Sequence, residues 1–386
     1  MKKQLFAALI AIVFIGSNAL AYYGPNDKSK KPTGKPKANC SPATAKYIME
    51  FNDVRALIEQ GGSMFQNRQN GVAAYEVPKG SNRFAIFAGA LWMGGTDVNG
   101  QLKLAALRYR AGNDFWPGPL SVTPGTGNYN PLFPVGDGAI RDFGEANIDP
   151  DQCIAYDQFY TIRKAEVIRF NIWWECQAGI TTECDDVQAP SNEELNRIYN
   201  WPAHGDVSKG QDYFLAPYYD RDQDGNYNPD NGDHPWYDDI LGRDDIQCGF
   251  DRRISLFGDE THWWVFNDKG NIHTETNGDP IGMEIRAQAF SFATNDEVNK
   301  MTFYNYELIN RGTQTLYDTY FAQYLDADVG NYADDYAGCD VSRGLGYMYN
   351  GDLNDENDGG KLGYGDNPPA IGCDFFEGPY QDADGI

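Results

Sequence analysis

The chain has 386 residues, with 31 lysines and arginines against 56 aspartates and glutamates, a formal net charge of −25, and 14% aromatic residues. Its length allows two or three domains with cores of their own, and its aromatic content argues against disorder over most of the chain. Because nucleic acid and anionic membranes are bound through basic surfaces, the acidic charge argues against both as partners. The 42 glycines and 20 prolines favour a β architecture rich in turns.

The N-terminus has the pattern of a signal peptide over residues 1–21. Two lysines precede an apolar run at residues 5–15, and the following Ala-Leu-Ala is typical of a cleavage site. The run is too short for a stable membrane anchor, which needs about 20 residues, and no second long apolar run follows. A buried N-terminal helix is the alternative. We expect a secreted or outer cell-surface protein, cleaved near Ala21, with no transmembrane segment in the mature chain.

Three further segments are predicted after the signal peptide. Residues 22–45 combine five lysines with proline and glycine, which indicates a flexible basic linker; a binding role for the lysines is the alternative. Residues 46–260 are expected to form a β-rich domain. Residues 261–386 are expected to form a β-sandwich-like domain with acidic loops. This second domain should be incomplete, because the sequence stops inside a pattern that resembles a ligand loop.

In the first predicted domain, apolar residues at 84–93 and 102–109 flank turn residues at 96–100, which predicts two strands joined by a turn. Residues 112–150 are rich in Gly, Pro and Asn and predict a long surface loop. Residues 156–174 alternate enough to predict a strand.

One helix is well marked in this domain. Ser191 and Glu194 form a capping box, and Leu195, Ile198 and Tyr199 share one helical face. The helix should end before the proline at position 202.

The second predicted domain begins with a hairpin, because apolar residues 263–266 and 272–274 flank turn residues. Further strands are predicted at residues 283–293, 301–310 and 315–325, and the last of these needs a bulge or burial on both faces. Residues 326–386 are strongly acidic and rich in Gly and Asn, and they should form loops. Short connections favour antiparallel pairing, so we expect a mainly β fold: antiparallel β-sandwich or jelly-roll-like domains with long Gly/Asn/Asp-rich loops and few short helices.

Seven cysteines would enter an oxidising compartment after export, where disulfides persist. They are Cys40, Cys153, Cys176, Cys184, Cys248, Cys339 and Cys373. None belongs to a C-x-x-C pair or has a His at zinc-ligand spacing, which argues against a metal cluster. Cys176/Cys184 and Cys339/Cys373 are two possible pairs, but the sequence leaves the connectivity open. Because seven is odd, one thiol is free or pairs outside the chain.

The sharpest candidate site is the D-x-D-x-D-G pattern that begins at Asp220. Closely spaced carboxylates, a glycine for a sharp turn and further oxygen donors are typical of Ca²⁺ loops. The expected ligands are Asp220, Asp222, Asp224, Asn226, Asn228, Asp230 and Asp233. Asn231 stands where an EF-hand has its bidentate Glu, and Pro229 disfavours a flanking helix. We therefore expect Ca²⁺ as the cofactor in a β scaffold rather than an EF-hand; a solvated acidic turn is the alternative.

Two weaker acidic clusters follow. Asp326, Asp328, Asp334 and Asp335 are expected at a strand end, where the pattern fits an ordinary acidic loop and a metal site equally well. Another D-x-D-G begins at Asp382 and is cut off by the end of the sequence.

Candidates for catalysis are scarce. The four histidines, His204, His234, His262 and His273, have no motif spacing, and H-E-x-x-H, G-x-S-x-G and Walker patterns are absent. The paired tryptophans at 173–174 and 263–264 could stack on sugars, although such residues more often fill a core. We name no catalytic residue and expect no hydrolysis by this chain.

Several stretches resemble large secreted proteins of the Bacteroidota. They are residues 75–80, 87–95, 114–120, 220–235, 292–296 and 338–340. The resemblance covers most of residues 50–386. It implies cargo of the type IX secretion system, with that machinery as a partner and a C-terminal sorting domain that this sequence lacks.

Together these observations predict a secreted or cell-surface structural, adhesive or binding protein, stabilised by calcium and disulfides, with surface polysaccharide or other surface proteins as possible partners. The alternative is a secreted hydrolase that degrades polysaccharide, or its non-catalytic carbohydrate-binding part. The paired carboxylates of such an enzyme have no local signature and cannot be chosen among 56 acidic residues.

Overall fold

A computed structural model describes residues 39–109, 111–122, 146–237 and 255–378. Lys37–Ile386 form one compact unit. The predicted signal peptide, most of the predicted linker and Cys248 lie outside the described residues. Among the described residues, no helix is both long and apolar enough to span a membrane.

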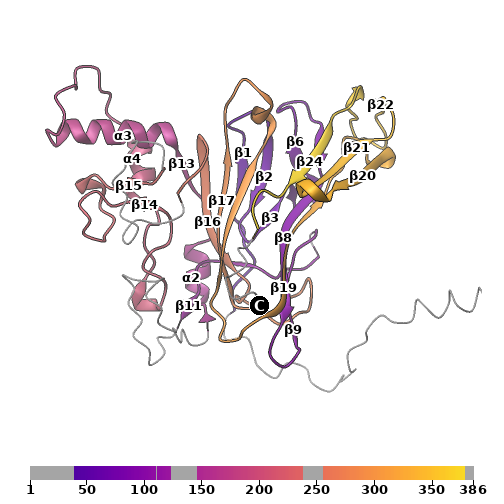
Figure 1. Cartoon of the computed structure of the whole chain (residues 1–386), viewed down its shortest axis with the longest axis horizontal. Helices are drawn as coiled ribbons and strands as arrows, with labels where there is room; N and C mark the ends of the chain where they lie inside the picture. The colour runs from indigo at the N-terminus through magenta and orange to yellow at the C-terminus, as the bar shows by residue number, and fades with distance from the viewer. Residues whose placement is uncertain (1–38, 110, 123–145, 238–254, 379–386) are drawn as a thin grey trace, which may run out of the picture. The chain divides into compact units, whose positions relative to one another are not determined.

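The fold is mainly β, and its largest sheet has eight strands in the order β19-β8-β3-β2-β6-β7, with β1 beside β2 and β9 beside β8 (Figure 1). All pairings in this first sheet are antiparallel. Its strands are β1 (Lys46–Met49), β2 (Arg55–Glu59), β3 (Ser63–Met64), β6 (Tyr75–Glu76), β7 (Phe84–Ile86), β8 (Ala88–Thr96), β9 (Leu102–Ala105) and β19 (Tyr317–Asp326).

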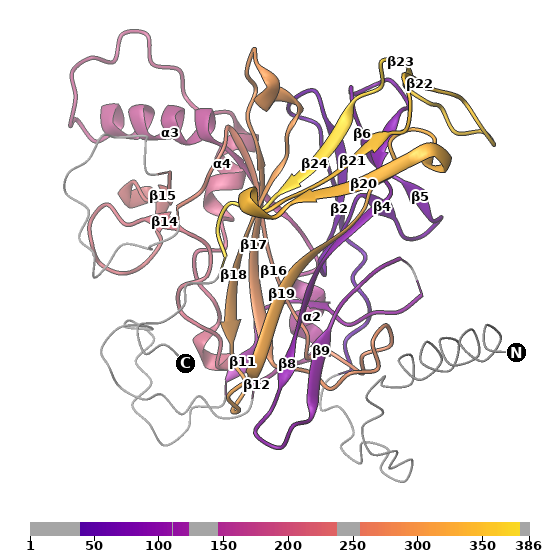
Figure 2. The same cartoon turned by 45° about the vertical axis from the view of Figure 1, so that its right-hand side comes forward.

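The second sheet has five antiparallel strands in the order β10-β16-β17-β18, with β13 also on β16. They are β10 (Trp116–Pro117), β13 (Tyr160–Arg163), β16 (Glu260–Asn267), β17 (Met283–Ser291) and β18 (Phe303–Asn310). A third sheet of three strands is a separate layer in Figure 2: β20 (Asp335–Asp340), β21 (Leu345–Asn350) and β24 (Ala370–Asp374).

Shorter elements connect these sheets. The two-stranded ribbons are β4 (Gln66–Asn67) with β5 (Val72–Ala73), β11 (Ser121–Val122) with β12 (Ala146–Asn147), β14 (Tyr218–Tyr219) with β15 (His234–Pro235), and β22 (Asn354–Asp355) with β23 (Gly365–Asp366). The helices are α2 (Pro150–Ala155), α3 (Lys164–Gln177) and α4 (Asn192–Tyr199), with single 3₁₀ turns η1 (Val207–Lys209), η2 (Pro229–Asn231), η3 (Glu297–Lys300), η4 (Tyr332–Asp334) and η5 (Val341–Arg343).

The first core is shared by the first and second sheets. Because side chains alternate along a strand, every second residue of β16 and β17 faces this core. The second sheet contributes Trp264, Phe266, Ile285, Ala287 and Ala289, and the first sheet contributes Ile58, Met64, Ala90 and Met93. The mainly β prediction is confirmed, and the description as a sandwich or jelly roll stays a prediction.

The second core lies on the opposite side of β16, where α3, α4 and the β14–β15 ribbon are grouped beside the second sheet (Figure 1). Trp263 and Val265 point into it from β16, and Phe170 and Ile198 point into it from the helices. Both faces of β16 are therefore covered, which explains why all eight of its residues are buried.

A third, smaller core surrounds a disulfide. Cys40 is bonded to Cys153 across 113 residues, and both are buried with Trp116, Leu120 and Ile148. Cys40 lies within the predicted linker, residues 22–45, and is buried and disulfide-bonded. The predicted surface loop at residues 112–150 is wrong in its described part, because it supplies this core and the edge strand β10.

Several local predictions are confirmed. The β8–β9 hairpin pairs Thr96 with Leu102 around the predicted turn, and β17 and β18 lie within the predicted strands. β19 covers most of its predicted strand and extends one residue beyond it, to Asp326. The register of β19 shifts between Tyr317 and Tyr320, which agrees with the bulge, one of the two alternatives predicted for this strand. Ser191 caps α4 in a capping box with Glu194.

The strand predicted at residues 156–174 is wrong over most of its length, because only β13 is strand and α3 follows directly. Val167, Phe170 and the half-buried Trp174 recur at helical spacing and face the second core, whereas Ile168 and Ile172 are exposed. The alternation of these two isoleucines with the buried residues imitated a strand.

The hairpin predicted at residues 263–274 is also wrong. β16 pairs with β17, and residues 268–282 form the long connection between them. Likewise β18 and β19 are consecutive but do not pair: β18 lies on β17, and β19 crosses to β8 in the first sheet. Both large sheets therefore combine strands from the two predicted domains. Residues 326–386, predicted as loops, contain the third sheet.

The cysteines are partly as predicted. Cys176 and Cys184 form a disulfide with a Cα–Cα distance of 5.8 Å, which confirms that pairing. Cys339 and Cys373 are free thiols. They lie on the two outer strands of the third sheet, each opposite Gly346 of the central strand. Two strand spacings of about 4.8 Å exceed the Cα separation that a disulfide spans.

Candidate metal centre

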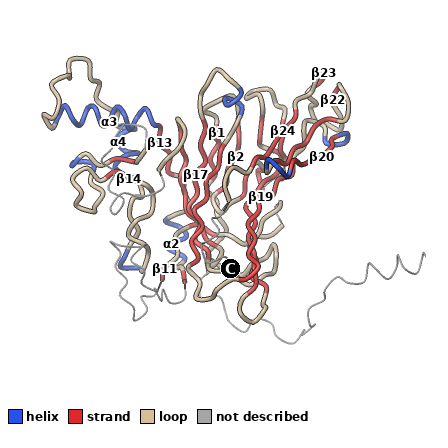
Figure 3. The backbone as a smooth tube through the Cα atoms, in the orientation of Figure 1, coloured by secondary structure: helices blue, strands red, loops and turns tan. Residues whose placement is uncertain are grey.

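The predicted Ca²⁺ loop, residues 220–233, connects β14 to β15 and contains η2. The two strands pair Tyr218 with Pro235 and Tyr219 with His234, which closes the loop at its base. Figure 3 shows this part of the chain as a long loop beside α3 and α4, with little regular structure. Side-chain contacts, rather than a backbone ladder, must therefore set its shape.

Three predicted ligands come together in this loop. One carboxylate oxygen from each of Asp220, Asp222 and Asp224 lies within 4.8 Å of the other two. Gly225 has φ +83°, a conformation that a residue with a side chain adopts only under strain. The predicted role of this glycine in the sharp turn is confirmed.

Asp220 has the most informative surroundings. Only 7% of its surface is exposed. Its Oδ2 accepts a hydrogen bond from the Gly225 amide at 2.8 Å, whereas its buried Oδ1 has no hydrogen-bond partner. Burial raises the pKa of Asp220, and the carboxylates of Asp222 and Asp224 raise it further. The Gln223 amide lies close enough to lower the pKa of this carboxyl, but Oδ1 has no hydrogen bond. The site therefore holds a buried carboxylate oxygen that a cation or a water molecule can satisfy.

The one basic residue within the loop does not neutralise these carboxylates. The Arg221 guanidinium donates to Asn171 and, at 3.1 Å, to Glu175, both on α3. It also lies over the Trp174 ring, with its Cζ 4.8 Å from the ring centroid. Arg221 thus anchors the loop to α3 and leaves the three aspartates without its charge.

Asp233 is fully buried and braces the loop. Its Oδ1 accepts from the Arg221 amide and its Oδ2 from the Asn228 amide, both at 2.8 Å. Burial raises the pKa of Asp233 to about 7, and the neighbouring acidic residues Asp220 and Asp222 add to the shift. This carboxylate ties the two ends of the loop together.

The remaining predicted ligands also have contacts of their own. Asn226 accepts from the Tyr213 hydroxyl through Oδ1. Asn228 caps η2 by accepting from the Asp230 amide at 3.1 Å. Asp230 accepts from the Tyr199 hydroxyl at 2.5 Å. The side chains of these three residues thus shape the loop, while the structure brings Asp220, Asp222 and Asp224 together.

The loop is linked to the second sheet through the preceding segment. Tyr213 contacts Asn226, and its neighbour Asp212 forms buried ion pairs with Arg286 of β17 and with Arg311. The importance of Asp212 and Tyr213 was not apparent from the sequence, because no local motif relates either residue to the loop.

The two histidines beside the loop act as hydrogen-bonding groups. His204 Nε2 accepts from the Tyr227 amide at 2.8 Å, and burial lowers the pKa of its imidazole. Burial also lowers the pKa of His234 to about 4. Both side chains are therefore neutral at neutral pH and add no positive charge to the site.

The donor set fits a hard divalent cation. Three carboxylates on a tight loop supply negatively charged oxygens, and Ca²⁺ accepts six to eight oxygens in flexible geometry, with water completing the shell. Thiolate or imidazole ligands for softer metals are absent from the described residues at this site.

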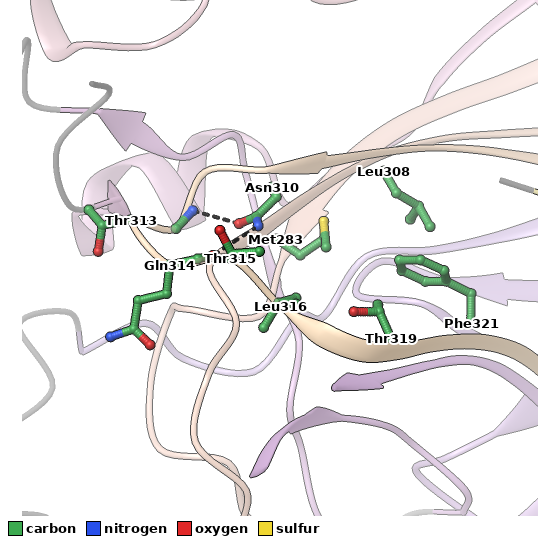
Figure 4. Close-up of a pocket in the computed structure, with 10 residues that line it drawn as sticks. Met283, Leu308, Asn310, Thr313, Gln314, Thr315, Leu316, Thr319 and Phe321 are labelled. Atoms are coloured by element: carbon green, nitrogen blue, oxygen red, sulfur yellow. Dashed lines mark hydrogen bonds between the residues drawn. The ribbon is translucent and has the colours of Figure 1, made fainter. Parts of the chain in front are cut away.

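A pocket of about 530 Å³ lies elsewhere, between the end of β18 and the start of β19. Figure 4 shows Met283, Leu308 and Phe321 along its apolar side and Asn310 on its polar side, with Asn310 Nδ2 donating to the Gln314 carbonyl. None of its lining residues is titratable or a strong nucleophile.

Two tryptophans and two histidines that the sequence offered as candidates are buried in the fold. Trp263 and Trp264 are fully buried and fill two different cores. His262 and His273 are buried as well: His262 Nδ1 lies 2.9 Å from Thr161 Oγ1, and His273 contacts the Leu104 and Asp268 carbonyls.

No protein-family model, curated protein or solved structure matches this chain.

Proposed function

We propose that the chain is an exported structural, adhesive or binding protein whose loop at residues 220–233 binds Ca²⁺ and so fixes the region around α3 and α4. The observation that carries the metal proposal is the orphaned Oδ1 of Asp220, buried beside two further carboxylates. Asp220, Asp222 and Asp224 are the proposed charged ligands, and the backbone carbonyl of Asn226 and water complete the shell.

The charge distribution supports this assignment. Three carboxylates within 4.8 Å repel one another, and Arg221 is committed to α3. A divalent cation removes that repulsion and satisfies the buried oxygen. Binding to the folded state alone contributes about 2.7 kcal/mol at a free concentration 100 times Kd.

Export is supported by the two disulfides, which fit an extracellular protein because such bonds persist in oxidising compartments. The signal peptide at residues 1–21 and the type IX route belong to the proposal and rest on the sequence. The polysaccharide-hydrolase alternative gains no support from the pocket at β18–β19, which has no titratable lining residue.

Thermal and urea unfolding of the mature chain in EDTA and in millimolar Ca²⁺ test the metal proposal. We expect Ca²⁺ to raise the stability by about 2–3 kcal/mol. Asp224→Asn should remove this gain while keeping the fold, because its amide oxygen can still accept from the Asn226 amide as Asp224 Oδ1 does at 2.7 Å.

Asp186→Asn is the matched control, because it removes the same charge from an exposed residue of the neighbouring segment 185–187. Its response to Ca²⁺ should equal that of the wild type. Identical unfolding midpoints of the wild type in EDTA and in Ca²⁺, together with no bound metal after dialysis, would refute the proposed site.

A further inference from the structure

A second set of orphaned oxygens lies at the edge of the third sheet. Asp335 begins β20, Asn350 ends β21, and the two residues are direct partners in the antiparallel register. Directly opposite side chains project from the same face, with Cβ atoms about 4.5–5.5 Å apart. Asp334, the last residue of η4, directly precedes Asp335 in the sequence.

Three side-chain oxygens in this group are buried without a hydrogen-bond partner: Asp334 Oδ1, Asp335 Oδ1 and Asn350 Oδ1. Asn350 is only 7% exposed. Buried acceptors are nearly always satisfied by protein or by ordered water, so each of these exceptions calls for a donor or a cation. The Asp334 carboxylate lies near enough to that of Asp335 to raise its pKa, so one cation between them can serve this group.

Rotation of the Asn350 amide does not resolve the problem. Its Nδ2 is oriented toward two backbone carbonyls, those of Asp352 and Asn354, each at 3.4 Å. Exchanging the nitrogen and oxygen would place Oδ1 against these two acceptors. The hydrogen-bond network therefore keeps Oδ1 on the other side of the amide.

The surrounding backbone is held by other groups, which leaves these oxygens unused. Asp335 Oδ2 accepts from the Val329 amide at 2.8 Å. Asp355, 1% exposed, joins the segments on either side by accepting from the Asn331 amide at 3.1 Å and the Tyr364 amide at 2.6 Å. Asp355 thus corresponds to Asp233 in the first loop: a buried carboxylate that braces the backbone.

The segment that leads into this group has no positive charge of its own. Residues 326–335 contain four aspartates and no lysine or arginine. Burial raises the pKa of Asp335 to about 6, and the nearby Asp334, Asp355 and Asp328 raise it further. The Asp326 carboxylate accepts a hydrogen bond from the Tyr109 hydroxyl at 2.8 Å.

We propose that Asp334, Asp335 and Asn350 form a second Ca²⁺ site, independent of the loop at residues 220–233, that fastens the third sheet to the chain preceding it. Carboxylate and amide oxygens are the donors that Ca²⁺ prefers, and water supplies the remaining ligands. The cation joins the end of η4 at Asp334 to the end of β21 at Asn350.

Calcium titration of the mature full chain, read out by calorimetry and by metal analysis after dialysis, tests this site with Ca²⁺ alone as the probe. The wild type should bind two equivalents. Asp335→Asn should bind one, because it removes one of the two charged ligands of the second site. The new amide can donate to Asn350 Oδ1, so this variant should unfold in EDTA at a temperature equal to or above that of the wild type.

The two sites are separated by their own variants. Asp224→Asn should lose the Ca²⁺ bound at residues 220–233 and keep the Ca²⁺ bound at the third sheet. Asp335→Asn should keep the former and lose the latter. Asp358→Asn, an exposed charge-matched control near the third sheet, should keep both.

A wild type that binds one equivalent, lost in Asp224→Asn, would overturn the second site and leave the first intact. Two equivalents retained in Asp335→Asn would likewise refute it. One equivalent that is lost only in Asp335→Asn would support the second site and refute the first.

Discussion

The two faces of β16 are stabilised in different ways. Trp264 faces the first core, between two sheets whose strands supply regularly alternating apolar residues. Its neighbour Trp263 faces the second core, which is covered by α3, α4 and irregular segments. The second side also depends on the Cys176–Cys184 disulfide and on the ion pair between Arg197 and Glu166 at 2.6 Å. One strand thus joins a region built by hydrophobic periodicity to a region built by specific polar contacts.

The comparison implies that the proposed Ca²⁺ site depends on the second core and not on the first. Asp220 and Arg221 follow Tyr218, a residue of the second core, and Arg221 is anchored on α3. Disturbing the two cores should therefore have different effects on metal affinity, even where the loss of stability is similar.

The largest expected effect comes from truncating the two tryptophans. Trp263→Ala and Trp264→Ala should each lower the free energy of unfolding by about 3–5 kcal/mol, because both side chains are fully buried. Urea denaturation measures this loss. Calorimetry should then show weaker Ca²⁺ binding by Trp263→Ala and unchanged binding to the first loop by Trp264→Ala.

The conservative variants Trp263→Phe and Trp264→Phe provide the same comparison if the alanine variants do not fold. An equal loss of Ca²⁺ affinity in both members of a pair would show that the two faces of β16 are not separable.

A smaller effect is expected from the pH dependence of stability. Burial lowers the pKa of His262 in β16, and Arg163 lowers it further, whereas Glu260, 3.4 Å away, partly opposes the shift. The His262 imidazole therefore binds a proton near pH 6.5 in the unfolded chain but not in the folded chain. The free energy of unfolding should fall as the pH drops below about 6.5, by at most about 1.4 kcal/mol per pH unit for one histidine.

Urea denaturation between pH 7.5 and 5.5 should give a shallower pH dependence for His262→Gln than for the wild type. The variant keeps His234, whose pKa burial lowers to about 4, so its stability should still fall with pH, but less steeply. An unchanged slope in His262→Gln would mean that His262 does not titrate as its burial requires.

The smallest expected effect concerns the start of α4, on the second-core side. Ser191 Oγ accepts from the Glu194 amide at 3.2 Å, so Ser191→Ala leaves that amide without its cap. We expect a loss of about 1 kcal/mol in urea denaturation. Ser191→Asp, which retains a capping oxygen, should restore most of it; no difference between the two variants would show that the cap is not a stabilising contact.

The same contrast explains what could be predicted from the sequence. The strands β17, β18 and β19, the bulge in β19 and the capping box of α4 depend on neighbours within a few residues, so local patterns predicted them. The pairing of β19 with β8 and the bond between Cys40 and Cys153 join residues far apart in sequence. Local patterns carry no information about such partners.

The candidate site divides in the same way. The spacing of Asp220, Asp222 and Asp224 predicted their proximity, because they belong to one turn. The bracing role of Asp233 depends on how the loop closes, and the position of Asn350 opposite Asp335 depends on the register of two strands. These roles became visible only in three dimensions.

Hydrogen exchange of the mature chain, followed peptide by peptide in EDTA and in saturating Ca²⁺, tests the proposed division most directly. We expect Ca²⁺ to slow exchange strongly at residues 220–233, where the amides of Gly225 and Asn226 donate to Asp220 and Asp224. We expect little change in β16 and β17, which are fully paired. Equal exchange at residues 220–233 with and without Ca²⁺ would contradict the account, as would a uniform slowing across both cores.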